Sequence, residues 1–244
     1  MDRKIEVCLS PELIDSYETI GKVVIVADIF RATSCMAVAL AHGVKLIKPV
    51  ASLSDCKKLQ DEGYIAAAER GGQKVDGFDL GNSPFSYMDE SLKDRSIAMT
   101  TTNGTMALHR AVNAKQVIAG SFLNFSPLVN YLKKIRFDVL VLCAGWKGKV
   151  NLEDTLYAGA LVDALKASCR YGGDAALMSH LLYNNAKNDL PGFLEDADHT
   201  HRLVRLGQEE DIAFCLKKDM YTEIPVLRKG SLYKLTLSDM LLGM

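Results

Sequence analysis

The chain alternates short, β-rich apolar runs with segments whose apolar residues recur at helical spacing. Some runs, such as Val23–Ala27 and Val139–Cys143, are continuously apolar, as in strands covered on both faces of a sheet. This alternation predicts an α/β fold, a three-layer α/β/α sandwich around a mostly parallel sheet. The predicted strands are Lys4–Cys8, Val23–Ala27, Lys45–Pro49, Tyr64–Ala68, Ile97–Thr100, Gln116–Ala119 and Val139–Cys143, and the predicted helices are Ala32–His42, Ser54–Glu62, Thr105–Val112, Ser126–Ile135 and Glu153–Tyr171.

The pattern changes after about residue 174, where helical spacing dominates. Asp174–Asn188 and Asp198–Lys218 are predicted helices, with a Pro-Gly break between them. Ile224–Arg228 and Leu232–Leu237 predict a late edge strand or hairpin. Because no Gly/Ser linker divides the chain, we expect a single α/β catalytic domain, either undivided or as two lobes (1–173 and 174–244) around one cleft.

Composition excludes several classes of partner. Lys and Arg number 29 against 30 Asp and Glu, so the chain lacks the basic surplus of a nucleic-acid-binding protein. Its longest apolar runs are too short to span a bilayer. The six cysteines form no C-x-x-C pair and the first residues do not resemble a signal peptide, which predicts reduced thiols and a cytoplasmic location. The oligomeric state, including a homo-oligomer, stays open.

Acidic and basic side chains follow the ends of two predicted strands. Asp28 directly follows Val23–Ala27, and Arg31 comes three residues later. In such a place Asp28 predicts a metal ligand or a nucleophile, and Arg31 can grip an oxyanion; the alternative is a helix N-cap with a surface arginine. Glu69 and Arg70 directly follow the predicted strand Tyr64–Ala68. The alternative there is a turn with a surface ion pair.

Two further segments offer neutral donors to an anion. Gly81-Asn82-Ser83-Pro84 is typical of a helix start, whose free N–H groups can also bind an anion. The run 100–105 joins a strand to a helix, and its Gly, Asn and hydroxyl groups are what a phosphate cradle needs, although it is not a P-loop. The predicted substrate-binding residues here are Asn82, Ser83, Thr101, Thr102, Asn103, Gly104 and Thr105.

A last cluster follows Val139–Cys143. Gly145 and Lys147 are predicted to contact substrate, and Glu153 and Asp154 open a long helix. Acids at a helix start favour the helix dipole without any function. Carboxylates at Asp28, Glu69, Glu153 and Asp154 would nevertheless repel an anionic ligand unless a cation lies among them, which predicts Mg²⁺ held by Asp28, Glu153 and Asp154.

Taken in order, the motifs DIFRAT, ERGG, GNSP, TTTNGT and CAG…ED resemble the 2-phosphosulfolactate phosphatase family. The resemblance covers nearly the whole chain and is most specific from Val24 to Asp163. It implies a Mg²⁺-dependent hydrolase that converts 2-phospho-3-sulfolactate to 3-sulfolactate and phosphate, a step towards coenzyme M. The residues expected to act on this small anionic phosphorylated substrate are Asp28, Arg31, Glu69 and Arg70.

Two other functions fit parts of the sequence. A non-catalytic α/β module that binds a phosphorylated small acid would use the same Thr, Asn, Gly and Arg residues, but it would not need acids at three strand ends. A phosphatase for another phosphorylated hydroxy acid would need both these residues and the acids at the three strand ends. A haloacid-dehalogenase-type enzyme is disfavoured because Phe30 stands where its second Asp is required.

Overall fold

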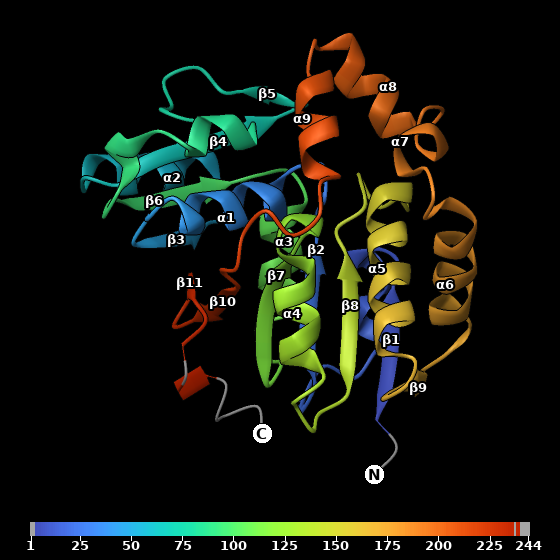
Figure 1. Ribbon diagram of the computed structural model, residues 1–244. Helices are drawn as coiled ribbons and strands as arrows, with labels where there is room; N and C mark the ends of the chain where they lie inside the picture. Colours follow the sequence, from blue (N-terminus) through green and yellow to red (C-terminus); the bar gives the residue numbers. More distant parts are fainter. Residues whose placement is uncertain (1–2, 237, 240–244) are drawn as a thin grey trace.

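A computed structural model describes residues 3–236 and 238–239 of the chain. It is an α/β structure built on one 11-stranded sheet, in the order β5-β4-β6-β3-β11-β10-β7-β2-β8-β1-β9 (Figure 1). The predicted fold class, with a mostly parallel sheet, is confirmed. The strands are β1 (Lys4–Cys8), β2 (Val23–Ala27), β3 (Leu46–Pro49), β4 (Ile65–Arg70), β5 (Gln73–Lys74), β6 (Ser96–Thr100), β7 (Gln116–Gly120), β8 (Val139–Cys143), β9 (Arg170–Tyr171), β10 (Pro225–Arg228) and β11 (Ser231–Lys234).

Helices cover both faces of the sheet, as the alternating pattern predicts. They are α1 (Ala32–Ala41), α2 (Leu53–Asp61), α3 (Gly104–Arg110), α4 (Phe125–Leu132), α5 (Leu152–Leu165), α6 (Asp174–Ala186), α7 (Leu190–Phe193), α8 (Asp198–Arg205) and α9 (Glu209–Cys215). Four 3₁₀ segments complete the described chain: η1 (Pro11–Ser16), η2 (Pro84–Tyr87), η3 (Glu90–Leu92) and η4 (Phe122–Asn124).

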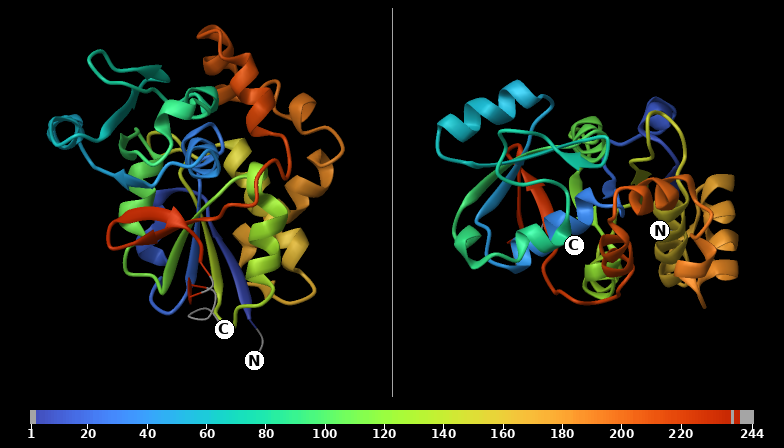
Figure 2. Two further views of the ribbon diagram at one scale, coloured as in Figure 1. Left: turned by 60° about the vertical axis from the view of Figure 1, so that its left-hand side comes forward. Right: turned by 90° about the horizontal axis from the view of Figure 1, so that it is seen from above.

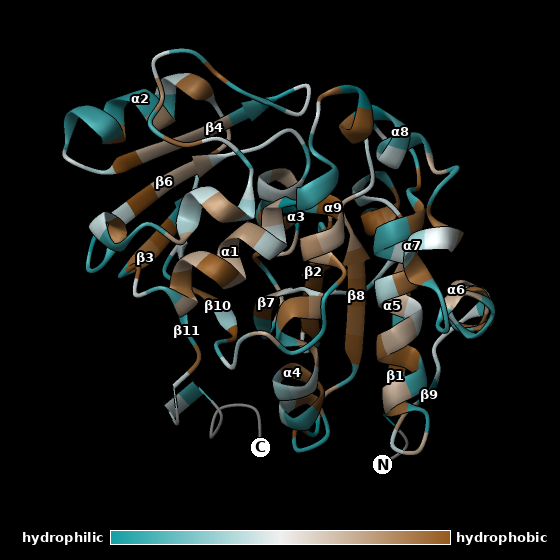
Figure 3. Ribbon diagram, turned by 45° about the horizontal axis from the view of Figure 1, so that its top comes forward, coloured by the Kyte–Doolittle hydropathy of each residue, from teal (hydrophilic) through white to brown (hydrophobic). Residues whose placement is uncertain are grey.

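The central strand β2 shows why its sequence is continuously apolar. Val23 and Ile25 belong to the hydrophobic cluster that α4, α5 and α6 share, whereas Val24 and Val26 belong to the cluster of α1 and α3. Successive side chains of a strand point to opposite faces, so a strand covered on both sides needs apolar residues at every position. All five residues of β2 are buried, and the hydrophobic colouring of β2 and β8 in Figure 3 follows from this arrangement.

The late hairpin lies inside the sheet and not at its edge. β10 and β11 pair antiparallel with each other, β10 with β7 and β11 with β3. The expectation of an edge strand is therefore wrong, while the hairpin itself is confirmed; Leu237, the last residue of the expected strand, lies outside the described residues. The hairpin connects two parallel blocks, β4-β6-β3 and β7-β2-β8-β1-β9.

Two predicted helices differ from the structure: one ends earlier than its pattern suggests, and the other is divided in two. The helix expected to run to Tyr171 ends at Leu165, because Arg170–Tyr171 pairs with β1 as the short strand β9. The helix expected over Asp198–Lys218 is divided into α8 and α9 around Gly207, whose φ of +68° is a left-handed conformation that suits glycine.

The carboxyl ends of both parallel blocks meet in one region. In Figure 1 the strands of the β4-β6-β3 block lie across the view and those around β2 run upright, so the ends of β4, β6, β2 and β8 converge. Figures 1 and 2 show α8 and α9 above the ends of β2 and β8. Open parallel sheets bind ligands beyond the carboxyl ends of their strands, so this region is the candidate site. No helix of the described residues is long and apolar enough to cross a membrane.

Candidate active site

Asp28 lies at the centre of this region, where β2 passes into α1. Asp28 is only 8% exposed, and its Oδ1 accepts a hydrogen bond from the Ala32 N–H at 3.2 Å. Burial raises the pKa of Asp28 to about 6, and the nearby carboxylates of Glu69 and Glu153 act in the same direction. The Ala32 N–H and His199 oppose the shift. Asp28 is therefore a carboxyl group whose charge is costly without a cationic partner.

Gly104 is the residue of the Thr/Asn/Gly run that lies directly beside Asp28. A Cβ at this position would be 2.7 Å from Asp28 Oδ2 and 2.7 Å from the Cβ of Ala32. A side chain there would displace the carboxylate, so glycine lets the loop between β6 and α3 approach it closely. Asn103 and Thr102, which precede Gly104, line the same cavity as Asp28.

Glu69 joins two loops at the rim of that cavity. Its Oε1 accepts from the Gly72 N–H at 2.6 Å, and its Oε2 accepts from the N–H and the hydroxyl of Thr102, each at 3.3 Å. Glu69 is buried and lines the cavity with Asp28. Its carboxylate therefore fixes the β4–β5 turn against the β6–α3 loop.

Arg31 is buried among protein acceptors. It lines the Asp28 cavity, but one Nη donates to Asp211 of α9 and the other donates to the Gly72 carbonyl at 2.7 Å. Ser83, predicted to bind substrate, donates instead to the second oxygen of Asp211 at 2.7 Å. This network ties α9 to the β4–β5 turn and to the start of η2.

Arg70 points to a different hollow. Its guanidinium donates to the Glu69 carbonyl at 2.6 Å and to Thr100 Oγ1 at 3.1 Å, and it lines a hollow of about 400 Å³ together with Thr101 and Thr105. Arg31 and Arg70, both expected to act on the substrate, therefore line different cavities. The Thr/Asn/Gly run is also divided, since Thr102 and Asn103 line the Asp28 cavity while Thr101 and Thr105 bond to each other.

Asp154 binds backbone amides of two strand ends. Its Oδ1 accepts from the Ile29 N–H at 2.8 Å and its Oδ2 from the Gly145 N–H at 3.1 Å. Complete burial, followed by the charges of Glu153 and Asp28, raises the pKa of Asp154 well above its usual range. Asp154 thus holds the ends of β2 and β8 together, and both of its oxygens are occupied.

The remaining predicted residues lie around this centre. Asn82 is buried and lines the Asp28 cavity. Gly145 has a φ of +56°, and a Cβ there would lie 2.4 Å from the Lys149 carbonyl oxygen. Lys147 donates its N–H to Asn103 Oδ1 at 3.4 Å, while its exposed side chain lies over the ring of Trp146, with Nζ 4.5 Å from the centroid.

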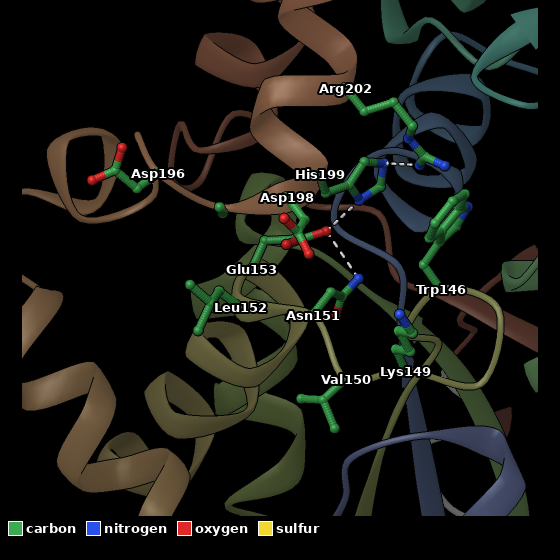
Figure 4. Close-up of a pocket in the computed structure, with 11 residues that line it drawn as sticks. Trp146, Lys149, Val150, Asn151, Leu152, Glu153, Asp196, Asp198, His199 and Arg202 are labelled. Atoms are coloured by element: carbon green, nitrogen blue, oxygen red, sulfur yellow. Dashed lines mark hydrogen bonds and ion pairs between the residues drawn. The ribbon is translucent and has the colours of Figure 1, made fainter.

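Sequence reasoning missed a chain of three polar side chains that ends at the cavity (Figure 4). Glu153 Oε1 lies 2.5 Å from His199 Nδ1, and His199 Nε2 lies 2.5 Å from Arg202 Nη2. Arginine can only donate, so His199 Nε2 accepts and its proton lies on Nδ1, toward Glu153. The missed signal is the His-x-x-Arg spacing, which places His199 and Arg202 on one face of α8. His201, two residues after His199, is exposed.

Two cavities meet at this chain. The Asp28 cavity is small, about 20 Å³, and a larger one of about 360 Å³ adjoins it (Figure 4). Trp146, His199 and Arg202 line both, and so form the wall between them. Arg202 stacks on Trp146, with its guanidinium carbon 4.3 Å from the ring centroid.

The donor set allows a Mg²⁺ site of a limited kind. Within residues 3–236 and 238–239, no three His, Cys, Asp or Glu side chains are grouped as metal ligands. Mg²⁺ often takes only one or two carboxylates and completes its shell with water and substrate oxygens. Asp28 and Glu69 line one cavity and fit this requirement. Asp154 lines neither cavity, so it is not placed to hold the ion. Glu153 lines the larger cavity, and its buried Oε2 has no hydrogen-bond partner among the described residues.

Comparison with known proteins decides the family. The model of the 2-phosphosulpholactate phosphatase family matches residues 8–230. The chain belongs to this family. It is therefore a phosphoric monoester hydrolase, and the resemblance to this family is confirmed.

Similar curated proteins carry the same name. A probable 2-phosphosulfolactate phosphatase of Thermotoga petrophila is 39% identical over 206 residues, which cover 84% of this chain and 89% of the relative. Those of Caldanaerobacter subterraneus subsp. tengcongensis and Caldicellulosiruptor saccharolyticus are 38% and 41% identical, over 86% and 80% of this chain and 89% and 84% of the relatives.

Proposed function

We propose that this chain is a cytoplasmic, Mg²⁺-dependent phosphatase that hydrolyses 2-phospho-3-sulfolactate to 3-sulfolactate and phosphate. The observation that carries the proposal is the buried Asp28, with Glu69 beside it, in a cavity walled by Arg31 and Arg202. Carboxylates and guanidiniums in one buried place suit an anionic substrate that binds together with a cation. The names of the relatives supply the substrate, and six free, buried cysteines support a reducing compartment.

Each group at the cavity then has a chemical task. Asp28 and Glu69 would hold Mg²⁺, which supplies positive charge to the phosphoryl oxygens. Asn103, on the loop that Gly104 brings against Asp28, can donate hydrogen bonds to the phosphoryl group. Thr102 donates to Glu69 and so helps to hold that carboxylate in place. Asp154 positions the chain on both sides by binding the Ile29 and Gly145 amides.

The position of Asp28 suits either of two roles: a metal ligand beside an attacking water, or the nucleophile. In the second, its carboxylate oxygen bonds to phosphorus, the ester oxygen leaves with a proton, and water then hydrolyses the acyl phosphate. The stereochemical course at phosphorus, followed with a substrate whose phosphoryl oxygens are isotopically chiral, separates the two. Two successive displacements through Asp28 give overall retention of configuration, and a single attack by water gives inversion.

The test of metal dependence is phosphate release from 2-phospho-3-sulfolactate by protein that has been treated with a chelator and gel-filtered. We expect activity to fall close to background and to return when Mg²⁺ is added, because the carboxylates alone repel the phosphoryl group. Protein treated identically without chelator is the control. Full turnover of the metal-free protein would reject the Mg²⁺ part of the proposal, and no turnover with Mg²⁺ present would reject the substrate.

A further inference from the structure

Arg202 carries hydrogen-bond donors that the protein does not use. Its Nε and Nη1 are buried, and no residue that the structure describes accepts a hydrogen bond from either. The same guanidinium is held firmly, by Nη2 on His199 and by its stacking on Trp146. Burying a donor without an acceptor costs about 1–3 kcal/mol, and more for a charged group. A guanidinium that is fixed in place but incompletely bonded is suited to receive an anion.

The other two arginines of the region do not present buried, unbonded donors to the Asp28 cavity. Arg31 lines the same cavity, but its two Nη groups are already bonded to Asp211 and to the Gly72 carbonyl. Arg70 faces the separate hollow beside Thr101. Arg202 is thus the arginine at the Asp28 cavity whose unused donors can meet a ligand.

The position of Arg202 indicates which part of a substrate it meets. The Asp28 cavity, at about 20 Å³, has room for one or two water molecules. A three-carbon substrate with phosphate, carboxylate and sulfonate is far larger, so with its phosphoryl group at Asp28 it must extend past the wall into the adjoining 360 Å³ cavity. Arg202 stands in that wall.

The acids around the larger cavity do not cancel this positive charge. Glu153 is engaged with His199 and Asn151, at 2.5 and 2.9 Å. Asp196 and Asp198 are exposed to solvent, and Figure 4 shows the Asp196 side chain apart from the others. Lys149, exposed on the opposite side, adds a second positive charge.

We propose that Arg202 binds the sulfonate of 3-sulfolactate, one of the two anionic groups that stay on the product, and that Glu153 and His199 position its guanidinium. The inference rests on the proposed function and names the residue that selects its substrate. A sulfonate presents three oxygens and stays ionised, and a planar guanidinium can donate to two of them at once. His199 accepts from Nη2 only while its own proton lies toward Glu153, so the three side chains hold the donors in one orientation.

The test is calorimetric titration of the Mg²⁺-loaded protein with 3-sulfolactate and, separately, with lactate, which lacks the sulfonate, and with inorganic phosphate. In Arg202→Gln we expect the affinity for 3-sulfolactate to fall roughly 10–150-fold, the equivalent of one charge-assisted hydrogen bond, and the affinities for lactate and phosphate to change less than about 3-fold. Arg205→Gln, on the exposed side of the same helix, is the matched control and should change none of the three affinities. Arg202→Lys should recover part of the loss, and it provides the same comparison if the Gln variant does not fold.

Equal losses for 3-sulfolactate and phosphate would show that Arg202 serves the phosphoryl group, and equal losses for 3-sulfolactate and lactate would show that it binds the carboxylate. No loss for any of the three would show that it binds no ligand. Each of these results overturns the inference. Turnover of 2-phospho-3-sulfolactate by the wild type decides the proposed function separately. If the wild type turns it over and Arg202→Gln keeps its affinity for 3-sulfolactate, only the inference fails. If the wild type does not turn it over, the proposed function fails and the sulfonate assignment fails with it.

A double variant tests the positioning role of His199. If His199 acts only through Arg202, His199→Ala should weaken 3-sulfolactate binding, and adding it to Arg202→Gln should cause no further loss. Additive losses would mean that His199 contacts the ligand itself or supports the fold, and the positioning role would be withdrawn.

Discussion

Asp28 combines a buried position with a charge that the protein alone does not neutralise. Its Oδ1 has one amide donor, Gly104 leaves the space beside Oδ2 open, and Arg31 is bonded elsewhere. Functional residues of this kind commonly lower the stability of the fold that holds them. The raised pKa of Asp28 makes that cost measurable.

In metal-free protein, Asp28→Asn should increase stability at pH 7.5 by about 3 kcal/mol. In the folded protein the pKa of Asp28 is about 6, above the ordinary aspartate value of 3.8. Wild-type stability from this group is therefore complete below about pH 4, and it is lost as the pH rises through 6. The gain from the substitution should disappear below pH 4.

Urea unfolding in EDTA at pH 4, 5.5 and 7.5 measures this difference. Asp76→Asn, at an exposed position, is the control and should change stability little at any of these pH values. An Asp28→Asn variant that is less stable than the wild type at pH 7.5 would show that the ionised carboxylate is well satisfied in the folded protein.

At the scale of elements, α8 and α9 bring the C-terminal part of the chain to the site. α8 contributes His199 and Arg202, and α9 contributes Asp211, the partner of Arg31. Sequence periodicity predicts helix over this stretch, but it cannot show that the helix is divided at Gly207. It also cannot show that Arg31 is used to fasten α9, because that ion pair joins residues 180 positions apart.

Removing the buried partner of Arg31 should be costly. We expect Asp211→Ala to lower the free energy of unfolding by about 3–5 kcal/mol, because it leaves Arg31 charged and unpaired in a buried position. The loss of the Ser83 hydrogen bond to the same carboxylate adds to the effect. Chemical denaturation at pH 7.5 measures it.

Glu210→Ala is the matched control for that variant. Glu210 is the neighbouring acid on α9 and is exposed, so its loss should change stability by no more than about 0.5 kcal/mol. Equal effects of the two substitutions would mean that the Arg31–Asp211 pair is not what holds α9 in place.

At the scale of the molecule, local patterns predicted the elements better than their arrangement. Lys4–Cys8, Val23–Ala27 and Val139–Cys143 form the predicted strands without a shift. The last two are short apolar runs, and the first alternates polar and apolar residues from Lys4 to Val7, which is the two-residue period of a strand. The β10–β11 hairpin could be predicted as a hairpin, but not as the link between two parallel blocks. Its place depends on single pairings with Ile118 and Ile47, which are distant in the sequence.

The candidate site, too, could be predicted from the sequence only in part. Acids and glycines at strand ends could be found from the sequence because parallel strands bring those ends together. Which arginine is free for a ligand depends on tertiary partners: Arg31 pairs with Asp211, Arg70 bonds to Thr100, and Arg202 reaches the cavity from α8. The two blocks converge on Asp28, so we expect the activity of the protein to depend on that residue.

The most direct test is the kcat/KM of the wild type and of Asp28→Asn on 2-phospho-3-sulfolactate with saturating Mg²⁺. We expect efficient phosphate release by the wild type and a loss of a few orders of magnitude in the variant, with the fold retained by circular dichroism. Near-normal activity of Asp28→Asn would contradict it, since Asp28 would then be neither a metal ligand nor the nucleophile.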